Sequence, residues 1–397
     1  MPPRRSPNLE SPIPNPHRSF LPRNVWVLGW VSLFNDTATE MSYWLLPQFL
    51  VGALGAGPMA FGLIEGAAET ASSLARLVSG FLSDRLARRK PLTAAGYTAA
   101  NLTKPLLALA QTWHQVFWTR FVDRAAKGFR GAPRDALLAD SVSASQRGAT
   151  FGLRLALDTA GAIAGPLGAL VLLPLFSGSV RRVFWVAGIP GLASALLAWF
   201  AVREVRPGAS GVRLGISAAF RRDNARLTFI LAAVAVFALG NSSDLFLILR
   251  AQNLGVRASL APALGLVFNV VYTILSWLVG RLSDRLSRRT LVLTGFLAYA
   301  MVYFFCLGTL AVRGMAALSV LWAVLRGGGA VLKAWIVDLV PSPSRASVYG
   351  LFNWVTGVAA FPASVLAGRL WQHFSPAAPF YVSAALASLA VALLLFA

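Results

Sequence analysis

The stretch Gly80-Phe81-Leu82-Ser83-Asp84-Arg85-Leu86-Ala87-Arg88-Arg89 returns 200 residues later as Gly280-Arg281-Leu282-Ser283-Asp284-Arg285-Leu286-Ser287-Arg288-Arg289, with eight of ten positions identical. Each copy follows one apolar run and precedes another. A charged segment that occurs once in each half of a hydrophobic chain indicates two related membrane-embedded halves. Short Arg-rich loops stay in the cytoplasm, so the repeat also predicts a topology.

The composition around this repeat is that of a membrane protein. Hydrophobic residues make up 56% of the 397 positions and charged residues 13%, whereas a soluble domain carries about 25% charged residues. The net charge of +21 lies in short loops between apolar runs, and no basic polar segment is long enough for a nucleic-acid module. We therefore expect a lipid bilayer as partner and no nucleic acid. The single cysteine, Cys306, excludes a disulfide framework.

Twelve mainly apolar segments are long enough, at about 20 residues each, to span a bilayer. They are 25–50, 59–82, 92–111, 114–138, 149–172, 183–202, 227–249, 261–281, 290–312, 316–339, 347–370 and 378–397. This predicts an all-α membrane protein with 12 transmembrane helices in two pseudo-symmetric six-helix bundles. The expected domains are a disordered cytoplasmic tail at 1–24, a bundle at 25–202, a cytoplasmic linker at 203–226 and a second bundle at 227–397.

The distribution of Lys and Arg predicts the orientation. The tail, the loop at 83–91, the linker and the loop at 281–289 carry four, four, six and four of these residues. The other side has scattered bases only: Arg181, Arg182, Arg250, Arg257, Arg313 and Arg369. The bias places both termini in the cytoplasm. A second repeat agrees, because Asp140, Arg147 and Gly152 recur at an offset of 198 as Asp338, Arg345 and Gly350.

The duplicated loop, G-x-L-x-D-R-x-x-R-R, resembles the signature of the major facilitator superfamily, and the resemblance extends from about residue 25 to the end. It implies a multi-pass transporter. The runs from Phe34 to Pro47 and from Gly131 to Ser141 resemble a prokaryotic branch of the superfamily, which implies the plasma (inner) membrane of a prokaryote. In that family the loop helps to latch the cytoplasmic side. The resemblance therefore implies a cytoplasmic gate made of Asp84, Arg85, Arg88, Asp140, Arg147, Asp284, Arg285, Arg288, Asp338 and Arg345. The alternative is that these charges only fix topology and helix ends.

Two shorter patterns resemble drug/proton antiporters of the superfamily. Gly152, Gly161, Gly165 and Pro166 follow G-x8-G-x3-G-P, although the small residues expected next are here Ala169 and Leu170. Arg124-Ala125-Ala126-Lys127-Gly128 is similar to R-x-x-Q-G, with lysine in place of glutamine. These patterns imply efflux. The alternative for the glycines is ordinary close helix packing.

Several charges lie at membrane depth in the first half. Charges facing lipid cost several kcal/mol each, so they must face a polar interior or each other. At about 1.5 Å per residue, Asp36, Glu69 and Asp158 fall near the midplane, with Glu40 and Glu65 further out. A carboxyl poised between burial and a nearby cation can load and release a proton. We expect Glu69, Asp36 and Asp158, followed by Glu40 and Glu65, to couple protons; the alternative is a static ion network.

The second half carries fewer charges at this depth. Asp244 aligns with Glu40, but Asn269 occupies the position of Glu69. The half offers aromatic surface instead, at Phe268, Tyr272 and Trp354. The predicted substrate-cavity residues are Arg124, Lys127, Asp244, Asn269, Tyr272 and Trp354.

Three functions remain open. The first is proton-coupled efflux of a small organic compound by alternating access. The second is uptake or exchange of an organic anion, drawn by Arg120, Arg124 and Lys127 on one helix face. The third is a sensor or scaffold, which a paired gate argues against. An enzyme is not expected, since no nucleophile–base motif or metal cluster is visible and His17, His114 and His373 are scattered. We expect a monomer without cofactor whose partners are a small molecule and protons.

Overall fold

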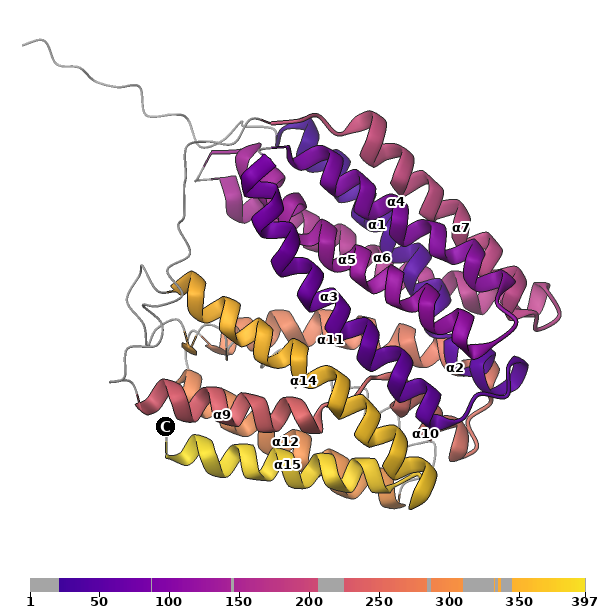
Figure 1. Ribbon diagram of the computed structural model, residues 1–397, viewed down its shortest axis with the longest axis vertical. Helices are drawn as coiled ribbons and strands as arrows, with labels where there is room; N and C mark the ends of the chain where they lie inside the picture. The colour runs from indigo at the N-terminus through magenta and orange to yellow at the C-terminus, as the bar shows by residue number, and fades with distance from the viewer. Residues whose placement is uncertain are drawn as a thin grey trace, which may run out of the picture.

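The computed structural model describes residues 21–86, 88–143, 146–205, 225–283, 287–309, 332, 335–336 and 345–396. Within these ranges, side chains are not described for residues 84, 225–226, 276–283, 288, 305–309 and 345–349. The described part of the chain is helical and contains no strand. Figure 1 shows two groups of long helices, one from each half of the chain.

The first half forms one bundle. Its elements are α1 (Arg23–Tyr43), α2 (Leu46–Gln48) with the π-helical turn η1 (Phe49–Ala53), α3 (Pro58–Leu86), α4 (Arg89–Leu109), α5 (Trp113–Asp140), α6 (Arg147–Leu175) and α7 (Val180–Leu196) with η3 (Leu197–Ala201). The second half contributes α9 (Ala225–Gly240), α10 (Leu245–Asn253), η4 (Ala258–Leu260), α11 (Ala261–Ser283), α12 (Arg288–Thr309), α14 (Arg345–His373) and α15 (Ala378–Leu395).

Each predicted apolar segment except the tenth coincides with described helices. The tenth, 316–339, falls almost entirely outside the described residues, as do most of the tail and the linker. In the part of the chain that is described, six helices are long and apolar enough to cross a membrane: Arg147–Leu175, Val180–Ala201, Leu227–Asn253, Ala258–Leu275, Gly350–His373 and Ala378–Leu395. The helices α3 and α5 of the first bundle, although 29 and 28 residues long, carry charged residues that lower their hydropathy.

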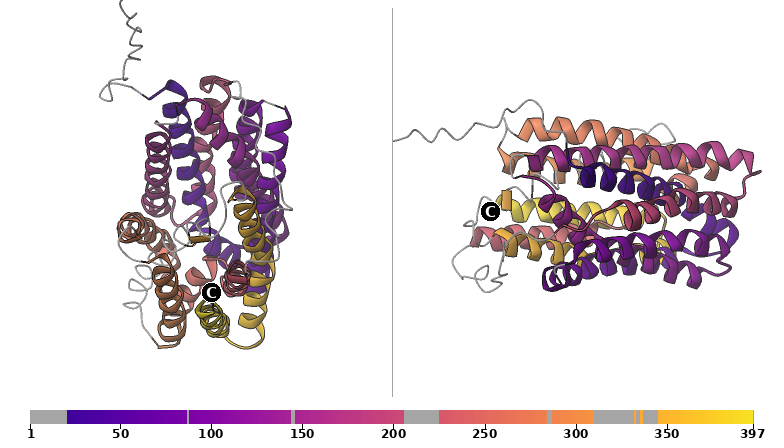
Figure 2. Two further views of the ribbon diagram at one scale, coloured as in Figure 1. Left: turned by 90° about the vertical axis from the view of Figure 1, so that its left-hand side faces the viewer. Right: turned by 90° about the horizontal axis from the view of Figure 1, so that it is seen from above.

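The helices of both bundles run between the same two ends of the molecule, and the bundles are tilted relative to each other (Figure 1). The start of α1, the α3–α4 junction and the end of α15 lie at one end, which we call the terminal end (Figure 1, left). The turns after η1, α4, α6, α10 and α14 lie at the other, the far end. The left view of Figure 2 looks onto the terminal end and shows the two bundles as separate groups of helices.

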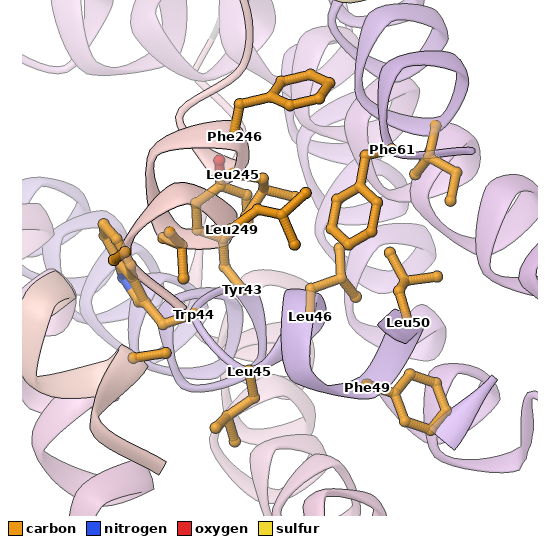
Figure 3. Packing of buried hydrophobic residues seen from close by; sticks show 14 of the residues in the cluster. Tyr43, Trp44, Leu45, Leu46, Phe49, Leu50, Phe61, Leu245, Phe246 and Leu249 are labelled. Carbon is orange, nitrogen blue, oxygen red and sulfur yellow. The ribbon is translucent and has the colours of Figure 1, made fainter. Parts of the chain in front are cut away.

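An apolar cluster joins the bundles at the far end. It combines Leu46, Phe49 and Phe61 of the first bundle with Leu245 and Phe246 of the second, all fully buried. Figure 3 shows these side chains interleaved across the junction. Toward the terminal end, the apolar clusters of the described residues each belong to one bundle only. The molecule is therefore sealed at the far end.

Helices α3 and α14 form the main seam between the bundles. Close approach depends on glycine: a Cβ at Gly62 would overlap the Ser364 carbonyl, and one at Gly66 would lie 3.0 Å from the Phe361 backbone. Thr70 Oγ1 donates a 2.8 Å hydrogen bond to the Gly357 carbonyl. Beyond this point the helices diverge. Among described atoms, a Cβ at Gly80 would meet only Ala132 of its own bundle, and one at Gly350 would meet nothing within 4 Å.

The glycines of α6 serve packing inside the first bundle. A Cβ at Gly161 would overlap the Leu33 carbonyl of α1, and one at Gly165 would lie 2.7 Å from the Thr37 carbonyl. Small residues of this kind allow membrane helices to approach closely. Helix α6 also meets the second bundle, where Asn269 Nδ2 of α11 donates to the Ala162 carbonyl at 2.7 Å.

Candidate functional site

A cavity of about 550 Å³ lies between the bundles, inside the far-end seal. Its volume falls within the roughly 300–1,000 Å³ that small-molecule sites occupy. The first bundle contributes Glu40, Tyr43, Trp44, Glu65, Glu69, Ser72, Ser73, Arg76, Arg124 and Lys127. The second contributes Val234, Phe237, Ala238, Asn241, Ser242, Ser243, Asp244, Phe268, Asn269, Phe296, Tyr299, Leu332, Phe352, Thr356, Gly357, Ala360 and Ser364.

The first-bundle wall is charged, and its charges are partly paired. Glu69 Oε1 of α3 lies 3.3 Å from Arg124 Nε of α5; the Glu69 side chain is 47% exposed and that of Arg124 is 12% exposed. Glu40 Oε2 accepts a 2.7 Å hydrogen bond from the Trp44 indole one turn later. The Arg124 guanidinium also lies over the Tyr43 ring, 5.5 Å from its centroid. This wall therefore combines a half-exposed carboxylate with a buried cation.

A buried ion network lies behind this wall and joins α3, α4 and α5. Arg120 donates to Glu65 Oε1 from Nε at 2.9 Å and from Nη2 at 2.7 Å, and to Asp123 Oδ2 from Nη1 at 3.0 Å. Lys104 Nζ donates to Asp123 Oδ1 at 2.9 Å. The four residues are 1–4% exposed. Two cations and two carboxylates alternate, so the network is neutral as a whole, and each charge has a partner.

The seventh predicted span is broken where it meets the cavity. Helix α9 ends at Gly240, and α10 begins at Leu245. The intervening Asn241, Ser242, Ser243 and Asp244 all line the cavity, and Ser243 Oγ accepts from the Leu245 N–H at 3.3 Å. Asn, Ser and Asp side chains compete with the backbone for hydrogen bonds and so favour helix ends. Irregular backbone at membrane depth is tolerated where it lines a cavity.

The second-bundle wall is aromatic. The rings of Phe237 and Phe296 are stacked, with centroids 4.0 Å apart and an interplanar angle of 9°, and Tyr299 meets Phe237 edge-on at 4.9 Å. Phe268 packs against Trp44 across the junction at 5.8 Å. The first-bundle wall is therefore rich in charged residues, whereas the second-bundle wall combines these aromatic rings with Asp244 and neutral polar residues.

The structure brings together most of the predicted cavity residues. Arg124, Lys127, Asp244 and Asn269 line the cavity, whereas Tyr272 and Trp354 do not. Tyr272 stacks on Phe268 at 6.4 Å, and Trp354 is 49% exposed on the outside of α14. Sequence reasoning missed Asn241, Ser242 and Ser243. A run of four polar residues inside an apolar span was the signal for them.

The five acids predicted to couple protons occupy different surroundings. Glu40, Glu65 and Glu69 line the cavity, but Glu65 is held by Arg120 in the buried network. Asp36 and Asp158 lie outside the cavity lining. Asp36 accepts a 2.8 Å hydrogen bond from Asn35, and Asp158 is paired with Arg154 one turn earlier. Their role in proton coupling stays a prediction.

Among the described gate residues, Asp140 forms an ion pair within the first bundle. Asp140 at the end of α5 pairs with Arg89, which starts α4 and also donates to the Ala136 carbonyl at 2.9 Å. Arg85, Arg88 and Arg147 are exposed. The side chains of the remaining predicted gate residues lie outside the described set: Asp84, Asp284, Arg285, Arg288, Asp338 and Arg345. Sequence reasoning also missed Glu204, whose carboxylate accepts from the N–H groups of Arg89 and Lys90 at 3.0 Å.

The basic stripe predicted along α5 is divided by its neighbours. Arg120 is buried in the ion network and faces away from the cavity lining, whereas Arg124 and Lys127 line the cavity. Only the last two are placed to meet a bound molecule.

Comparisons with known proteins agree with this architecture. The family model described as Major Facilitator Superfamily matches residues 28–250 and 227–397. An uncharacterised MFS-type transporter of Methanocaldococcus jannaschii is 32% identical over 387 residues, which cover 95% of each chain. The class B tetracycline resistance protein of Escherichia coli is 24% identical over 75% of each chain. The crystal structure of a bacterial homolog to the human lysosomal transporter Spinster superposes with a TM-score of 0.70 at 17% identity, covering 95% of both chains.

Proposed function

The chain belongs to the major facilitator superfamily, and from this premise we propose that it is a proton-coupled exporter of a small organic compound that works by alternating access. The single observation that carries the proposal is the cavity between the bundles, which is lined by charged residues. Among the described residues, an apolar cluster that spans both bundles closes this cavity at the far end. A cavity of this kind near the middle of the membrane is where transporters of this architecture bind cargo.

The seam between α3 and α14 supports a rocking motion. The two helices touch from the far end to about Thr70 and Gly357, and then diverge toward the terminal end. Two bundles that are packed along only part of a seam can rotate against each other as rigid bodies. Such a rotation opens the cavity at one end and closes it at the other. With both termini in the cytoplasm of a prokaryote, as the Arg-rich loops predict, the arrangement described here is the inward-open state.

Glu69 is the best placed of the acids to carry a proton. It is half-exposed to the cavity, and its ion partner Arg124 is buried beside it. A carboxylate between water and a buried cation can be protonated or deprotonated as its surroundings change. The relationship to an Escherichia coli tetracycline resistance protein supports the efflux direction.

The proposal is tested with purified protein in acid-loaded proteoliposomes. Candidate cargo is added outside, and proton release is followed with an external pH indicator. We expect cargo to drive proton release that depends on the protein. Cargo exchange that ignores the pH gradient contradicts proton coupling, and the absence of flux with a broad panel of drugs and metabolites favours a sensor or scaffold.

A specific observation keeps the organic-anion alternative open. Among the described residues, no carboxylate lies within 4.0 Å of the charged nitrogens of Lys127 or Arg76, although both line the cavity. Uptake or exchange of an anion would use these cations. The same vesicles distinguish the alternative, because anion exchange proceeds without a proton gradient.

A further inference from the structure

We propose that the cargo is an aromatic anion, whose ring system packs on Phe237 and Phe296 while its anionic group binds Lys127 and Arg76. This inference rests on the proposed transport function, because it assigns a chemical class to the cargo of the same cavity. It does not depend on the direction of transport or on proton coupling.

Three of the carboxylates that line the cavity already have a hydrogen-bond or ion-pair donor. Glu65 is bound by Arg120 and Glu69 by Arg124. Glu40 accepts from the Trp44 indole, and Asp244 also has an interaction partner. A cationic cargo that used Glu65 or Glu69 must first displace a guanidinium that is 2.7 or 3.3 Å away. Because displacing a buried ion partner is costly, these acids are poor receptors for a cation.

Two of the cations that line the cavity, Lys127 and Arg76, have no carboxylate partner among the described residues. Lys127 is attracted by Asp36 and Glu69 but repelled by Arg124 and Arg130, and it forms no ion pair among the described residues. Arg76 lies one turn beyond Ser72 and Ser73 on α3 and is exposed. An ammonium and a guanidinium supply several donors for an anionic group. A cation at membrane depth without an ion partner is costly, and a bound anion relieves that cost.

The opposite wall fits an aromatic body. Phe237, Phe296 and Tyr299 form a continuous ring cluster on the cavity side of α9 and α12, and Phe352 extends it from α14. Aromatic rings gain free energy from stacked and edge-to-face contacts in addition to apolar burial. Because Lys127 and Arg76 belong to one bundle and the ring cluster to the other, a molecule bound to both contacts both bundles at once.

The test is equilibrium binding to the full-length protein in lipid nanodiscs, at one pH and without a gradient. Three probes are compared: naphthalene-2-sulfonate, 2-naphthylmethylammonium and cyclohexanesulfonate, with empty nanodiscs subtracted. We expect the aromatic sulfonate to bind at least about tenfold more tightly than either of the others. Equal or tighter binding of the ammonium overturns the anionic assignment, and equal binding of the two sulfonates overturns the aromatic one. Failure of all three probes to bind counts against the inference as a whole.

Variants assign the effect to the proposed residues. Lys127→Gln is expected to weaken naphthalene-2-sulfonate binding about tenfold or more, and Lys127→Arg to restore it, which excludes general misfolding. Phe237→Leu should reduce the preference over cyclohexanesulfonate. The matched control is Arg257→Gln, which removes an exposed far-end cation outside the cavity. An unchanged affinity in Lys127→Gln contradicts the proposal. Since no proton movement is measured, binding without coupling leaves the inference intact while contradicting the proposed exporter.

Discussion

Replacing Arg120 by alanine is expected to destabilise the protein by about 3–5 kcal/mol, the range for breaking a buried ion pair by removing one partner. Arg120 makes three hydrogen bonds to Glu65 and Asp123, and all three side chains are nearly inaccessible. Without the guanidinium, Glu65 loses its cation and Asp123 keeps only Lys104. The neutral network then carries an uncompensated negative charge inside the bundle. Unfolding in mixed detergent micelles measures the loss.

Two further variants separate the charge effect from general damage. Arg257→Ala, which removes an exposed arginine, should change the stability by no more than about 0.5 kcal/mol. The double variant Lys104→Met with Asp123→Leu removes one member of each sign, so it should cost less than either single change. If Arg120→Ala unfolds like Arg257→Ala, the network does not stabilise the bundle.

Replacing Glu69 by glutamine is expected to abolish cargo-driven proton release in acid-loaded proteoliposomes. Glutamine keeps the size of the side chain and can accept a hydrogen bond from Arg124, but it cannot exchange a proton. The Glu69 side chain is 47% exposed and lines the cavity, so the substituted amide stays hydrated and the Arg124 guanidinium keeps a hydrogen-bond acceptor beside it. The fold should therefore survive, and the loss should lie in proton movement.

The matched control for Glu69→Gln is Glu204→Gln. Glu204 accepts from the backbone N–H groups at the start of α4 and is not part of the cavity lining. We expect Glu204→Gln to retain proton release, with at most a modest loss of stability from the weaker helix cap. Normal proton release by the Glu69→Gln protein would assign coupling to another group, and Asp36 is then the next residue to substitute.

The fold was predictable because its signals are strong and repeated. The duplicated segments at 80–89 and 280–289, together with spans of about 20 apolar residues, indicate paired helical bundles without any knowledge of contacts. The break at Asn241–Asp244 was not predicted, although its cause is local. The mean hydropathy of the span 227–249 is apolar, so averaging hides the four consecutive polar residues within it. These residues are tolerated at membrane depth because they line the cavity.

The sequence predicted which kinds of residue line the cavity, but not which cations form ion pairs with which carboxylates. Intramembrane charges must face the interior, and Glu69, Arg124 and Lys127 do line the cavity, although their roles in transport stay predictions. Helical spacing puts Arg120 on the same face as Arg124. In the structure, however, Arg120 forms ion pairs with Glu65 and Asp123. Partners contributed by α3 and α4 decide which cation is available, and periodicity within one helix carries no information about them.

The two bundles contribute different kinds of side chain to the cavity. The first bundle contributes charge through Glu69, Arg124 and Lys127, and the second contributes aromatic surface through Phe237 and Phe296. A cargo that contacts both walls can bias the equilibrium between two arrangements of the bundles, because it binds them differently in each arrangement. The duplicated gate is thus expected to serve an asymmetric cavity.

The most direct test of the account is a pair of distances measured between spin labels. One pair, at Leu86 and Leu395, spans the bundles at the terminal end, and the other, at Gln111 and His373, spans them at the far end; all four positions are exposed. The account predicts opposite changes when cargo is added or pH is altered: one distance shortens while the other lengthens. Two distances that stay fixed, or that change in the same direction, would contradict alternating access.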